Sequence, residues 1–387
     1  AEMPPIKVWH IGGEDVRFRL PLLLALRRRG FDVGAVGSEE GGGFRRDNVP
    51  YWRYTLVRRL SPLADLKTIR QLHRLFAEHR PDVIHAFDTK PTILAPAAAA
   101  RAGVPGRVST ITGMGYVFSS NSPLALALRP AYRLMQTWAA RSTGITIFQN
   151  SDDREYFLRK RMVRPGRDRL VRGSGIDIEE MLRTRPSQED LLALRRELKL
   201  DGRPVVTMIA RLVAEKGVRE YLEAAGRVRK ERPDTVFLLV GPAESEGSRA
   251  VPIEEVRRKA GDVLYLGPRS DVPAILGVSD LFVLPSYYRE GVPRVLLEAG
   301  AAGLPLVATQ MPGCRDVVKD GWNGLLVPPR DAGRLAAAIL RMLGASREER
   351  EAMGSRARSH VLEHFGLERV ADAYAEIYEA LAGRSAI

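Results

Sequence analysis

One stretch decides the fold class: Leu281-Phe-Val-Leu-Pro-Ser-Tyr-Tyr-Arg-Glu290-Gly-Val-Pro-Arg-Val-Leu-Leu-Glu298-Ala-Gly-Ala-Ala-Gly303. Its first four residues form a short apolar run, which is typical of a strand buried on both faces. Pro293 suits the first position of a helix, and Gly303 suits the C-terminal cap. The stretch therefore predicts a strand, a loop and a helix, which is the repeating unit of a parallel α/β sheet.

The same alternation extends in both directions along the chain. In the first half, the predicted strands are Ile6–Ile11, Val33–Val36, Val83–Ala86, Val108–Ile111 and Ile145–Gln149, and the predicted helices are Leu20–Arg29, Leu66–His79, Ile93–Ala102 and Pro130–Arg141. After the polar stretch Arg183–Pro186 the alternation restarts, with predicted strands at Val205–Ile209, Val236–Val240, Val263–Tyr265, Leu281–Leu284 and Leu306–Ala308. Two doubly wound sheets are therefore expected.

The chain of 387 residues is long enough for two such domains. We expect an N-terminal Rossmann-like domain at residues 1–180 and a C-terminal one at residues 181–365. A last helix within residues 366–387 is expected to pack back on the N-terminal domain. Ligands of doubly wound sheets bind outside the carboxyl ends of the strands, so two facing domains would create a cleft between them.

Composition and charge indicate the cellular compartment and the kind of binding partner. A single cysteine, Cys314, excludes an intrachain disulfide and favours a reducing compartment. Neither a signal peptide nor a membrane-spanning helix is predicted. Residues 1–180 carry 29 Lys+Arg against 18 Asp+Glu, whereas residues 181–387 carry 31 against 29. This asymmetry favours an anionic partner for the first half, either nucleic acid, a membrane surface or a phosphorylated acceptor. The alternative is a generally arginine-rich composition.

Two cations follow the predicted strand Val205–Ile209. Arg211 and Lys216 at the carboxyl end of a strand can bind diphosphate oxygens, and each charge-assisted bond contributes roughly 1.5–3 kcal/mol. No Asp-x-Asp pair follows a predicted strand, so the sequence predicts no metal. The alternative is a solvated loop that happens to contain two cations.

Further candidates lie where other predicted strands end. The helix that starts near Pro293 offers free N–H groups to a phosphate, and Glu290 beside it can accept hydrogen bonds from sugar hydroxyls. The alternative is a surface helix with solvated acids, which the sequence Gly291-Val292-Pro293 after Glu290 makes the less favoured interpretation. Glycines allow a close approach of backbone to phosphate, and they occur after predicted strands at Gly12-Gly13, Gly241 and Gly267.

These motifs resemble a known family. Glu290-x7-Glu298, Arg211…Lys216-Gly217 and the run Gly321–Pro329 look like the retaining glycosyltransferases of family 4, which have the GT-B fold. The resemblance implies catalytic roles for Arg211, Lys216 and Glu290. It also implies that Glu298 binds the ribose, that Gly13 lies near the phosphates, and that no metal or other cofactor is needed. From the strand exits and the start of the predicted helix, we expect the donor to be bound in addition by Gly241, Gly267, Arg269, Gly291, Val292, Pro293 and Arg294.

The first half is similar to a subgroup of that family. The similarity lies in Ile84–Pro91, Thr110–Phe118, Phe148–Asp153 and Gly173–Asp177. Members of the subgroup act on undecaprenyl-diphosphate-linked saccharides in bacterial glycan and glycoprotein biosynthesis. The similarity implies a UDP-sugar donor, with an N-acetylhexosamine and above all N-acetylgalactosamine favoured. Many members have a histidine where this chain has Thr112, so we expect Lys90, Thr112, Gly113 and Tyr116 to contact the acceptor instead.

Apolar and basic residues concentrate in the first half. The apolar ones are Tyr116, Val117, Phe118, Leu124, Leu126, Leu128, Leu134, Met135 and Trp138, and the basic clusters are Arg27–Arg29, Arg45-Arg46, Arg58-Arg59 and Arg159–Arg161. This combination is typical of a protein that lies on an anionic leaflet. We therefore expect a cytoplasmic enzyme, peripheral on the inner face of the cytoplasmic membrane. Ordinary core packing is the alternative for several of the apolar residues.

The expected reaction is a front-face displacement in which the leaving diphosphate is stabilised by Arg211 and Lys216. Other readings remain open at this point. The enzyme could use a different UDP- or GDP-sugar and a soluble acceptor, or it could be a nucleotide-sugar epimerase. The charge alone would also suit a nucleic-acid binder, but no recognition motif supports one, and nucleic acid is not an expected partner. A non-catalytic membrane scaffold is the last alternative.

Overall fold

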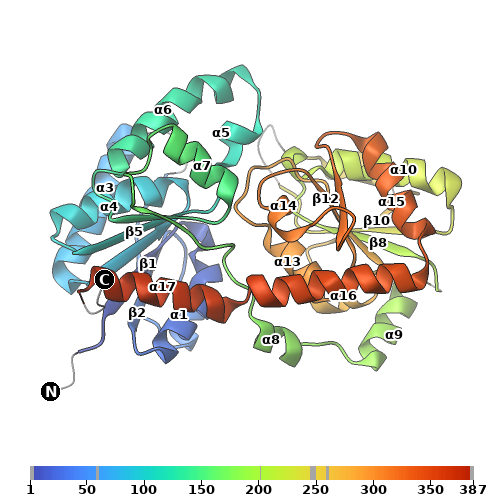
Figure 1. Cartoon of the computed structure of the whole chain (residues 1–387), viewed down its shortest axis with the longest axis horizontal. Coiled ribbons are helices and arrows are strands. Elements are labelled where there is room, and N and C mark those ends of the chain that lie inside the picture. Colours follow the sequence, from blue (N-terminus) through green and yellow to red (C-terminus); the bar gives the residue numbers. More distant parts are fainter. Residues whose placement is uncertain (1–3, 58–60, 201, 245–249, 259–260, 384–387) are drawn as a thin grey trace. The chain divides into compact units, whose positions relative to one another are not determined.

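The computed structural model describes residues 4–57, 61–200, 202–244, 250–258 and 261–383, and the chain forms two compact units. Unit 1 comprises Ala1–Gly175, Glu290–Val292 and Leu367–Ile387, and unit 2 comprises Ile176–Arg289 and Pro293–Gly366. The chain thus passes from unit 1 to unit 2 at 175/176, near the predicted boundary at 180/181. Each unit contains a parallel sheet with helices on both faces, which confirms the predicted α/β class (Figure 1).

The sheet of unit 1 has the strand order β3-β2-β1-β4-β5-β6-β7. Its strands are β1 (Lys7–Ile11), β2 (Asp32–Gly37), β3 (Tyr51–Arg53), β4 (Val83–Phe87), β5 (Gly106–Ile111), β6 (Ile145–Phe148) and β7 (Asp168–Leu170). Its helices are η1 (Glu14–Arg19), α1 (Leu20–Arg28), α2 (Gly42–Arg46), α3 (Pro62–His79), α4 (Thr89–Arg101), α5 (Gly115–Ser119), α6 (Pro123–Ala139), α7 (Ser151–Arg159) and α17 (Leu367–Leu381). The order reverses beside β1, as in other doubly wound sheets.

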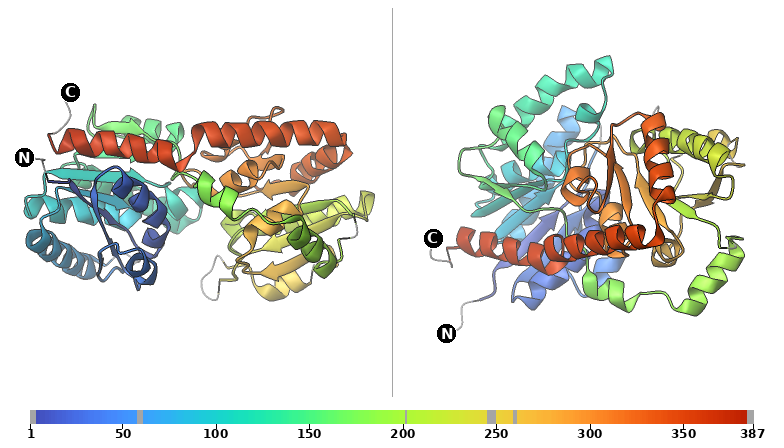
Figure 2. Two further views of the ribbon diagram at one scale, coloured as in Figure 1. Left: turned by 90° about the horizontal axis from the view of Figure 1, so that it is seen from below. Right: turned by 45° about the vertical axis from the view of Figure 1, so that its right-hand side comes forward.

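Successive side chains of β1 point to opposite faces of the sheet, and this alternation separates two cores. Val8 packs in the cluster that α1 and α17 cover, whereas Trp9 packs in the cluster that α3 and α4 cover. Helix α17 lies beside α1 (Figures 1 and 2). The last helix of the chain therefore completes the core of the unit in which the chain begins.

A buried polar network joins α17 to the sheet. The hydroxyl of Tyr378 is hydrogen-bonded to Nε2 of His10 at 3.0 Å and to Nδ1 of His85. Nε2 of His85 is in turn 2.6 Å from the hydroxyl oxygen of Thr110. Burial lowers the pKa of His10 to about 3 and the pKa of His85 well below its ordinary value, so both imidazoles are neutral at pH 7. One tyrosine thus links α17 to β1 and β4.

Helix α6 begins earlier than predicted. The sequence predicts a helix that starts at Pro130, but α6 begins at Pro123 and contains Pro130 in its interior. The side chain of Ser122 accepts a hydrogen bond from the amide of Ala125 at 3.2 Å, which is an N-cap. A serine cap followed by a proline is the stronger start signal. None of the helices in the described ranges is long and apolar enough to cross a membrane.

The sheet of unit 2 has the order β10-β9-β8-β11-β12-β13. Its strands are β8 (Val205–Ile209), β9 (Val236–Val240), β10 (Val263–Gly267), β11 (Leu281–Leu284), β12 (Leu306–Thr309) and β13 (Gly324–Val327). Its helices are α8 (Ile178–Arg183), α9 (Gln188–Glu197), η2 (Ala214–Lys216), α10 (Val218–Glu231), α11 (Ile253–Arg257), α12 (Val272–Gly277), α13 (Arg294–Ala301), α14 (Cys314–Val317), α15 (Ala332–Gly344) and α16 (Arg347–His364).

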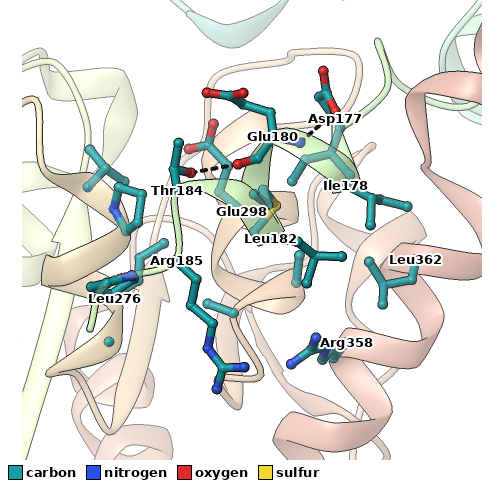
Figure 3. A pocket seen from close by; sticks show the side chains of 18 of the residues that line it. Asp177, Ile178, Glu180, Leu182, Thr184, Arg185, Leu276, Glu298, Arg358 and Leu362 are labelled. Atoms are coloured by element: carbon teal, nitrogen blue, oxygen red, sulfur yellow. Dashed lines mark hydrogen bonds between the residues drawn. The ribbon is translucent and has the colours of Figure 1, made fainter. Parts of the chain in front are cut away.

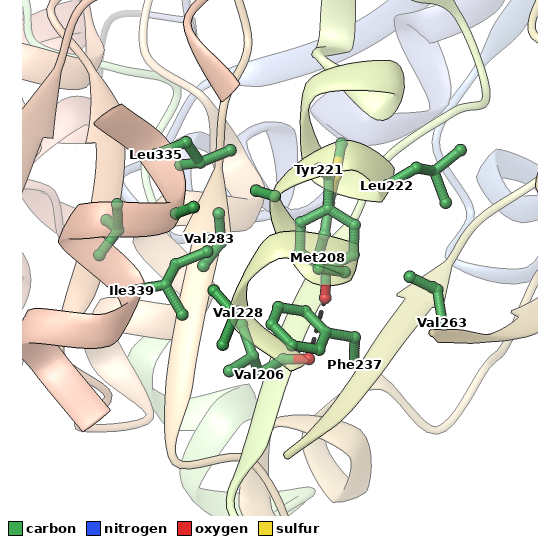
Figure 4. Close-up of a cluster of buried hydrophobic side chains, with 14 of the residues drawn as sticks. Val206, Met208, Tyr221, Leu222, Val228, Phe237, Val263, Val283, Leu335 and Ile339 are labelled. Atoms are coloured by element: carbon green, nitrogen blue, oxygen red, sulfur yellow. Dashed lines mark hydrogen bonds between the residues drawn. The ribbon is translucent and has the colours of Figure 1, made fainter. Parts of the chain in front are cut away.

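One face of this sheet packs on α10 and α15, as Figure 4 shows for Val206, Met208 and Ile339. The hydroxyl of buried Tyr221 of α10 lies within hydrogen-bond distance of main-chain carbonyls of two strands, Val206 O at 2.9 Å and Leu238 O at 2.8 Å, which share its one hydrogen. The other face packs on α9 and α12. Unit 2 therefore has its own two-sided core.

The network around Tyr378 generates a prediction about stability. Tyr378→Phe keeps the ring and removes the hydroxyl, which leaves both buried imidazoles without that partner. We expect the free energy of unfolding to fall by about 1–3 kcal/mol, measured by urea denaturation followed by circular dichroism. Tyr51→Phe is the control, because that hydroxyl makes an exposed hydrogen bond to Glu39 O. Equal stabilities of the Tyr378→Phe and Tyr51→Phe variants would contradict the role of the network.

Candidate functional site

Backbone hydrogen bonds connect the carboxyl ends of neighbouring strands in unit 2. After β9 and β10, the amide of Gly241 donates to Gly267 O at 2.9 Å. After β8 and β9, the amide of Leu212 donates to Pro242 O at 3.0 Å. The loops that follow three adjacent strands are therefore fixed to one another at the edge where ligands of doubly wound sheets bind.

The loop after β11 is fixed to the same edge. The carbonyl of Glu215 accepts hydrogen bonds from the amides of Tyr287 at 2.8 Å and Tyr288 at 3.0 Å. The hydroxyl of Ser286 also contacts this carbonyl, at 3.3 Å. Because Glu215 precedes Lys216, these bonds hold the predicted phosphate-binding loop against the exit of β11.

Two glycines make this close packing possible. Gly217 has a φ of 77°, and a Cβ placed there would lie 2.1 Å from the carbonyl oxygen of Pro285. Gly241 has a φ of 141°, and its Cβ would lie 2.0 Å from Ala210 O. Any side chain would thus collide with main-chain atoms of the neighbouring loop.

The two predicted cations lie on this loop after β8. Arg211 forms an ion pair with Glu244 at 2.8 Å, and the arginine side chain is 54% exposed. The ammonium of Lys216 lies 5.5 Å from the centroid of the Tyr288 ring, within the range of a cation–π contact. Both positive charges are therefore at the edge formed by the strand exits.

Arg269, which follows β10, is held more firmly. Its guanidinium donates to both carboxylate oxygens of Asp271, at 2.8 and 2.6 Å, and to Glu197 at 3.2 Å. The hydrogen bond to Asp271 raises the pKa of Arg269 most strongly among its favourable contacts. The guanidinium of Arg269 is thus hydrogen-bonded to two carboxylates, whereas that of Arg211 is paired with one, so Arg269 is less available to a ligand.

Helix α13 differs slightly from the prediction at its start. Pro293 is the N-cap, with φ −65° and ψ 115°, and Arg294 is the first helical residue, so the prediction that Pro293 opens the helix is wrong by one position. Its extended ψ excludes it from the helix. Gly303, with a φ of 85°, follows the C-cap Ala302 as expected. Arg294 and Glu298 form an ion pair at 3.0 Å one turn apart.

Arg294 and Glu298 also line a pocket of about 440 Å³ in unit 2. Figure 3 shows Asp177 and Glu180 of the α8 segment at one end of it and Arg185 at the other. The pocket is lined by Ile176, Asp177, Ile178, Glu180, Met181, Leu182, Thr184, Arg185, Pro186, Gln188, Leu191, Val272, Pro273, Leu276, Gly277, Arg294, Glu298, Ala301, Ala302, Arg358 and Leu362. Sequence patterns do not predict this pocket, because helices far apart in the chain form its wall.

In unit 1, the predicted donor contact Gly13 follows β1, and its amide donates to the carboxylate of Asp88 at 3.3 Å. Lys90, predicted to bind the acceptor, forms an ion pair with Asp65 at 2.6 Å, and its side chain is only 14% exposed. An acceptor would have to compete with that carboxylate. The side chain of Tyr116 lies outside the described residues.

Glu290, Gly291 and Val292 group with unit 1 and meet the predicted acceptor residues there. Glu290 and Gly113 form an antiparallel bridge, and the amide of Gly291 donates to Thr112 O at 2.7 Å. The carbonyl of Gly291 accepts a hydrogen bond from buried Asn150 at 3.1 Å. The sequence analysis predicts no site role for Asn150. Its position directly after the predicted strand Ile145–Gln149 would have indicated one, because ligands bind where strands of such sheets end.

Two doubly wound sheets with basic groups where strands of the second sheet end form an architecture that can bind phosphorylated ligands. Residues 192–360 match the family described as glycosyl transferases group 1, and residues 16–173 match the glycosyl transferase 4-like domain. Together the two matches span most of the chain, and the protein therefore belongs to the glycosyltransferases built from these two domains.

Individual relatives and structures agree with this family. The UDP-Gal:alpha-D-GlcNAc-diphosphoundecaprenol alpha-1,3-galactosyltransferase of Escherichia coli is 28% identical over 356 residues, which are 90% of this chain and 89% of the relative. The N,N'-diacetylbacillosaminyl-diphospho-undecaprenol alpha-1,3-N-acetylgalactosaminyltransferase of Campylobacter jejuni is 28% identical over 338 residues, 86% of this chain and 88% of the relative.

Among solved structures, Anabaena Alr3699/HepE in complex with UDP and glucose is similar with a TM-score of 0.80 and 20% identity, over 97% of this chain and 100% of that one. Sucrose-phosphate synthase from Thermosynechococcus elongatus is similar with a TM-score of 0.77 and 21% identity, over 98% and 100%. The predicted GT-B fold is thereby confirmed.

The close packing at Gly217 leads to a prediction. Gly217→Ala places a methyl group against Pro285 O, so we expect the β8 loop to shift and the affinity for UDP to fall at least about tenfold, measured by calorimetry. Gly321→Ala is the matched control, because Gly321 has a similar φ of 72° and nothing lies within 4 Å of its Cβ position. Both variants place alanine at a positive φ, but only the methyl group at position 217 collides with another atom, the carbonyl oxygen of Pro285. Equal UDP affinities in both would contradict the argument.

Proposed function

We propose that this glycosyltransferase moves a sugar from a UDP-sugar to an undecaprenyl-diphosphate-linked saccharide, with retention of anomeric configuration and without a metal ion. N-Acetylgalactosamine is the first candidate for the donor sugar. The observation that carries the proposal is the pair Arg211 and Lys216 on a loop whose backbone is fixed to the neighbouring strand exits. The named activities of the relatives from Escherichia coli and Campylobacter jejuni support the acceptor class.

In the proposed reaction, the bond between the anomeric carbon and the diphosphate breaks as the acceptor hydroxyl attacks from the same face. The leaving phosphate oxygen takes the proton of that hydroxyl. Arg211 and Lys216 stabilise the negative charge that develops on the diphosphate, which is the largest expected contribution. The ion pair of Arg211 with Glu244 is exposed and worth no more than about 1 kcal/mol, so a diphosphate can replace the carboxylate.

The remaining predicted contacts are part of the same proposal. Glu290 would accept hydrogen bonds from hydroxyls of the donor sugar, and Glu298 would bind the ribose. Glu298 is already bonded to Arg294, which would leave one carboxylate oxygen for a ribose hydroxyl. Thr112 would contact the acceptor in place of the family histidine.

We also propose that unit 1 lies on the inner face of the cytoplasmic membrane. Helix α6 has no acidic residue, and no aspartate or glutamate occurs anywhere between Asp88 and Asp152. The exposed apolar side chains of α6 include Leu124, Leu134 and Trp138, and Leu134 is 72% exposed. Apolar side chains on a helix within a basic, acid-free segment suit an anionic lipid surface.

The test of the reaction is a screen of UDP- and GDP-sugars against undecaprenyl-diphosphate saccharides, with products detected by mass spectrometry in excess chelator. We expect transfer from a UDP-sugar, and a strict requirement for added magnesium or manganese would contradict the metal-independent mechanism. Conversion of a UDP-sugar without any acceptor would indicate an epimerase instead.

Lys216→Ala should lower kcat/KM in that assay at least tenfold, about 1.4 kcal/mol of barrier, because the leaving diphosphate loses one cation. Lys230→Ala is the control, since Lys230 lies near the C-terminal end of α10 and outside the proposed site. A rate near normal for the Lys216 variant would count against the assignment.

Sedimentation with vesicles tests the membrane proposal. We expect the protein to bind vesicles rich in phosphatidylglycerol, and Leu134→Glu should lower the bound fraction at least about threefold, because it adds a negative charge to the apolar face. Leu192→Glu is the matched control, because Leu192 is 56% exposed on α9 of unit 2. Equal binding of both variants would refute a lipid contact through α6.

A further inference from the structure

The segment Glu290–Val292 is held in place by hydrogen bonds to the amide and to the carbonyl of Gly291. The amide of Gly291 donates to Thr112 O at 2.7 Å, and its carbonyl accepts from Nδ2 of Asn150 at 3.1 Å. The hydrogen bond between Gly291 and Thr112 is part of the antiparallel bridge that pairs Glu290 with Gly113. With both polar groups of Gly291 engaged, the orientation of the peptide next to Glu290 is fixed.

Asn150 is itself fixed, so it can act as a rigid support. Its side chain is fully buried. The carboxamide oxygen accepts from the amide of Asp153 at 2.8 Å, which caps α7. The NH2 group donates to the Asp153 carboxylate at 3.1 Å as well as to Gly291 O. The NH2 group therefore donates once to the carboxylate of Asp153 and once to the loop that carries Glu290.

Gln149, which precedes Asn150, packs so closely on Gly291 that only glycine fits at position 291. A Cβ at Gly291 would lie 2.0 Å from Oε1 of Gln149 and 2.9 Å from Thr112 O. Gln149 is buried, and its Nε2 has no hydrogen-bond partner within the described residues. Retaining an amide in this position costs stability, because a buried donor without a partner is unfavourable. The loop thus rests against a wall formed by Gln149 and Asn150.

From these contacts we infer that Asn150 is a positioning residue, which acts through Gly291 to orient the carboxylate of Glu290 toward the donor sugar. The inference rests on the proposed function, because it takes Glu290 as the group that binds the sugar hydroxyls. Asn150 does not touch the substrate in this reading. Its hydrogen bond restricts Glu290 to one orientation, and misplacement of a binding group by about 1 Å can lower a rate as much as 100-fold.

The variant Asn150→Ser separates positioning from helix capping. Serine is as good an N-cap as asparagine, so α7 keeps its cap, but a hydroxyl is too short to reach Gly291 O in the same way. We expect the melting temperature to change little and turnover with UDP-N-acetylgalactosamine to fall about tenfold. The affinity for UDP, which lacks the sugar, should stay within about twofold of the original value.

A double-mutant cycle tests whether Asn150 acts through Glu290. If it does, Asn150→Ser combined with Glu290→Ala should be no slower than Glu290→Ala alone. Rates in the double variant that equal the product of the two single losses would overturn the inference and leave the proposed function intact. Normal turnover of the Glu290→Ala variant would overturn the inference and the proposed role of Glu290, whereas the proposed transfer reaction would stand.

Hydrogen exchange supplies a readout that needs no substrate. In the free protein, Asn150→Ser should speed the exchange of the Gly291 and Val292 amides at least about fivefold, while amides within α7 keep their protection. Ser122→Ala, which removes the cap of α6 instead, is the control and should leave the Gly291 amide unchanged. Unchanged exchange at Gly291 in the Asn150 variant would refute the positioning role.

Discussion

The hydrogen bonds between the main chains of neighbouring strand exits are the constraint on which the candidate site of unit 2 depends. The carbonyl of Glu215 receives two amides from the loop after β11, and the amide of Gly241 reaches the exit of β10. These bonds require backbones at contact distance, and Gly217 and Gly241 permit this because they have no side chain. Lys216 is fixed by this framework, since it lies between the bonded carbonyl and the essential glycine.

Much of the fold could be predicted because its signal is local. Short apolar runs separated by helical patterns predict parallel strands wherever they occur, and both sheets were found in this way. The positions of Arg211 and Lys216 after β8 could also be predicted, since they need only the end of one strand. The start of α6 differs from the prediction because a proline also occurs inside the helix, at Pro130, whereas the N-cap is Ser122.

The partners of the candidate residues could not be predicted, because they come from distant parts of the chain. Lys90 is bonded to Asp65, and Gly291 is bonded to Asn150, which lies 141 residues earlier. Hydrophobic periodicity contains no information about such pairs. The roles of these residues in binding and transfer therefore depend on experiments rather than on the pattern, and the structure supplies the variants that make those experiments selective.

Helix α17 belongs to unit 1 although it follows unit 2 in the sequence, and this has a consequence for protein engineering. Because α17 supplies Tyr378 to the core of unit 1, unit 2 lies between residues 1–175 and 367–387 of unit 1, and residues 290–292 of unit 1 interrupt it. Exchange of unit 2 between relatives by recombination thus requires crossover points near 175/176 and 366/367 and on both sides of residues 290–292. A chimera joined at the first point alone would import a foreign α17 against a native sheet. Residues 290–292 would need to come from the recipient that supplies Thr112 and Asn150.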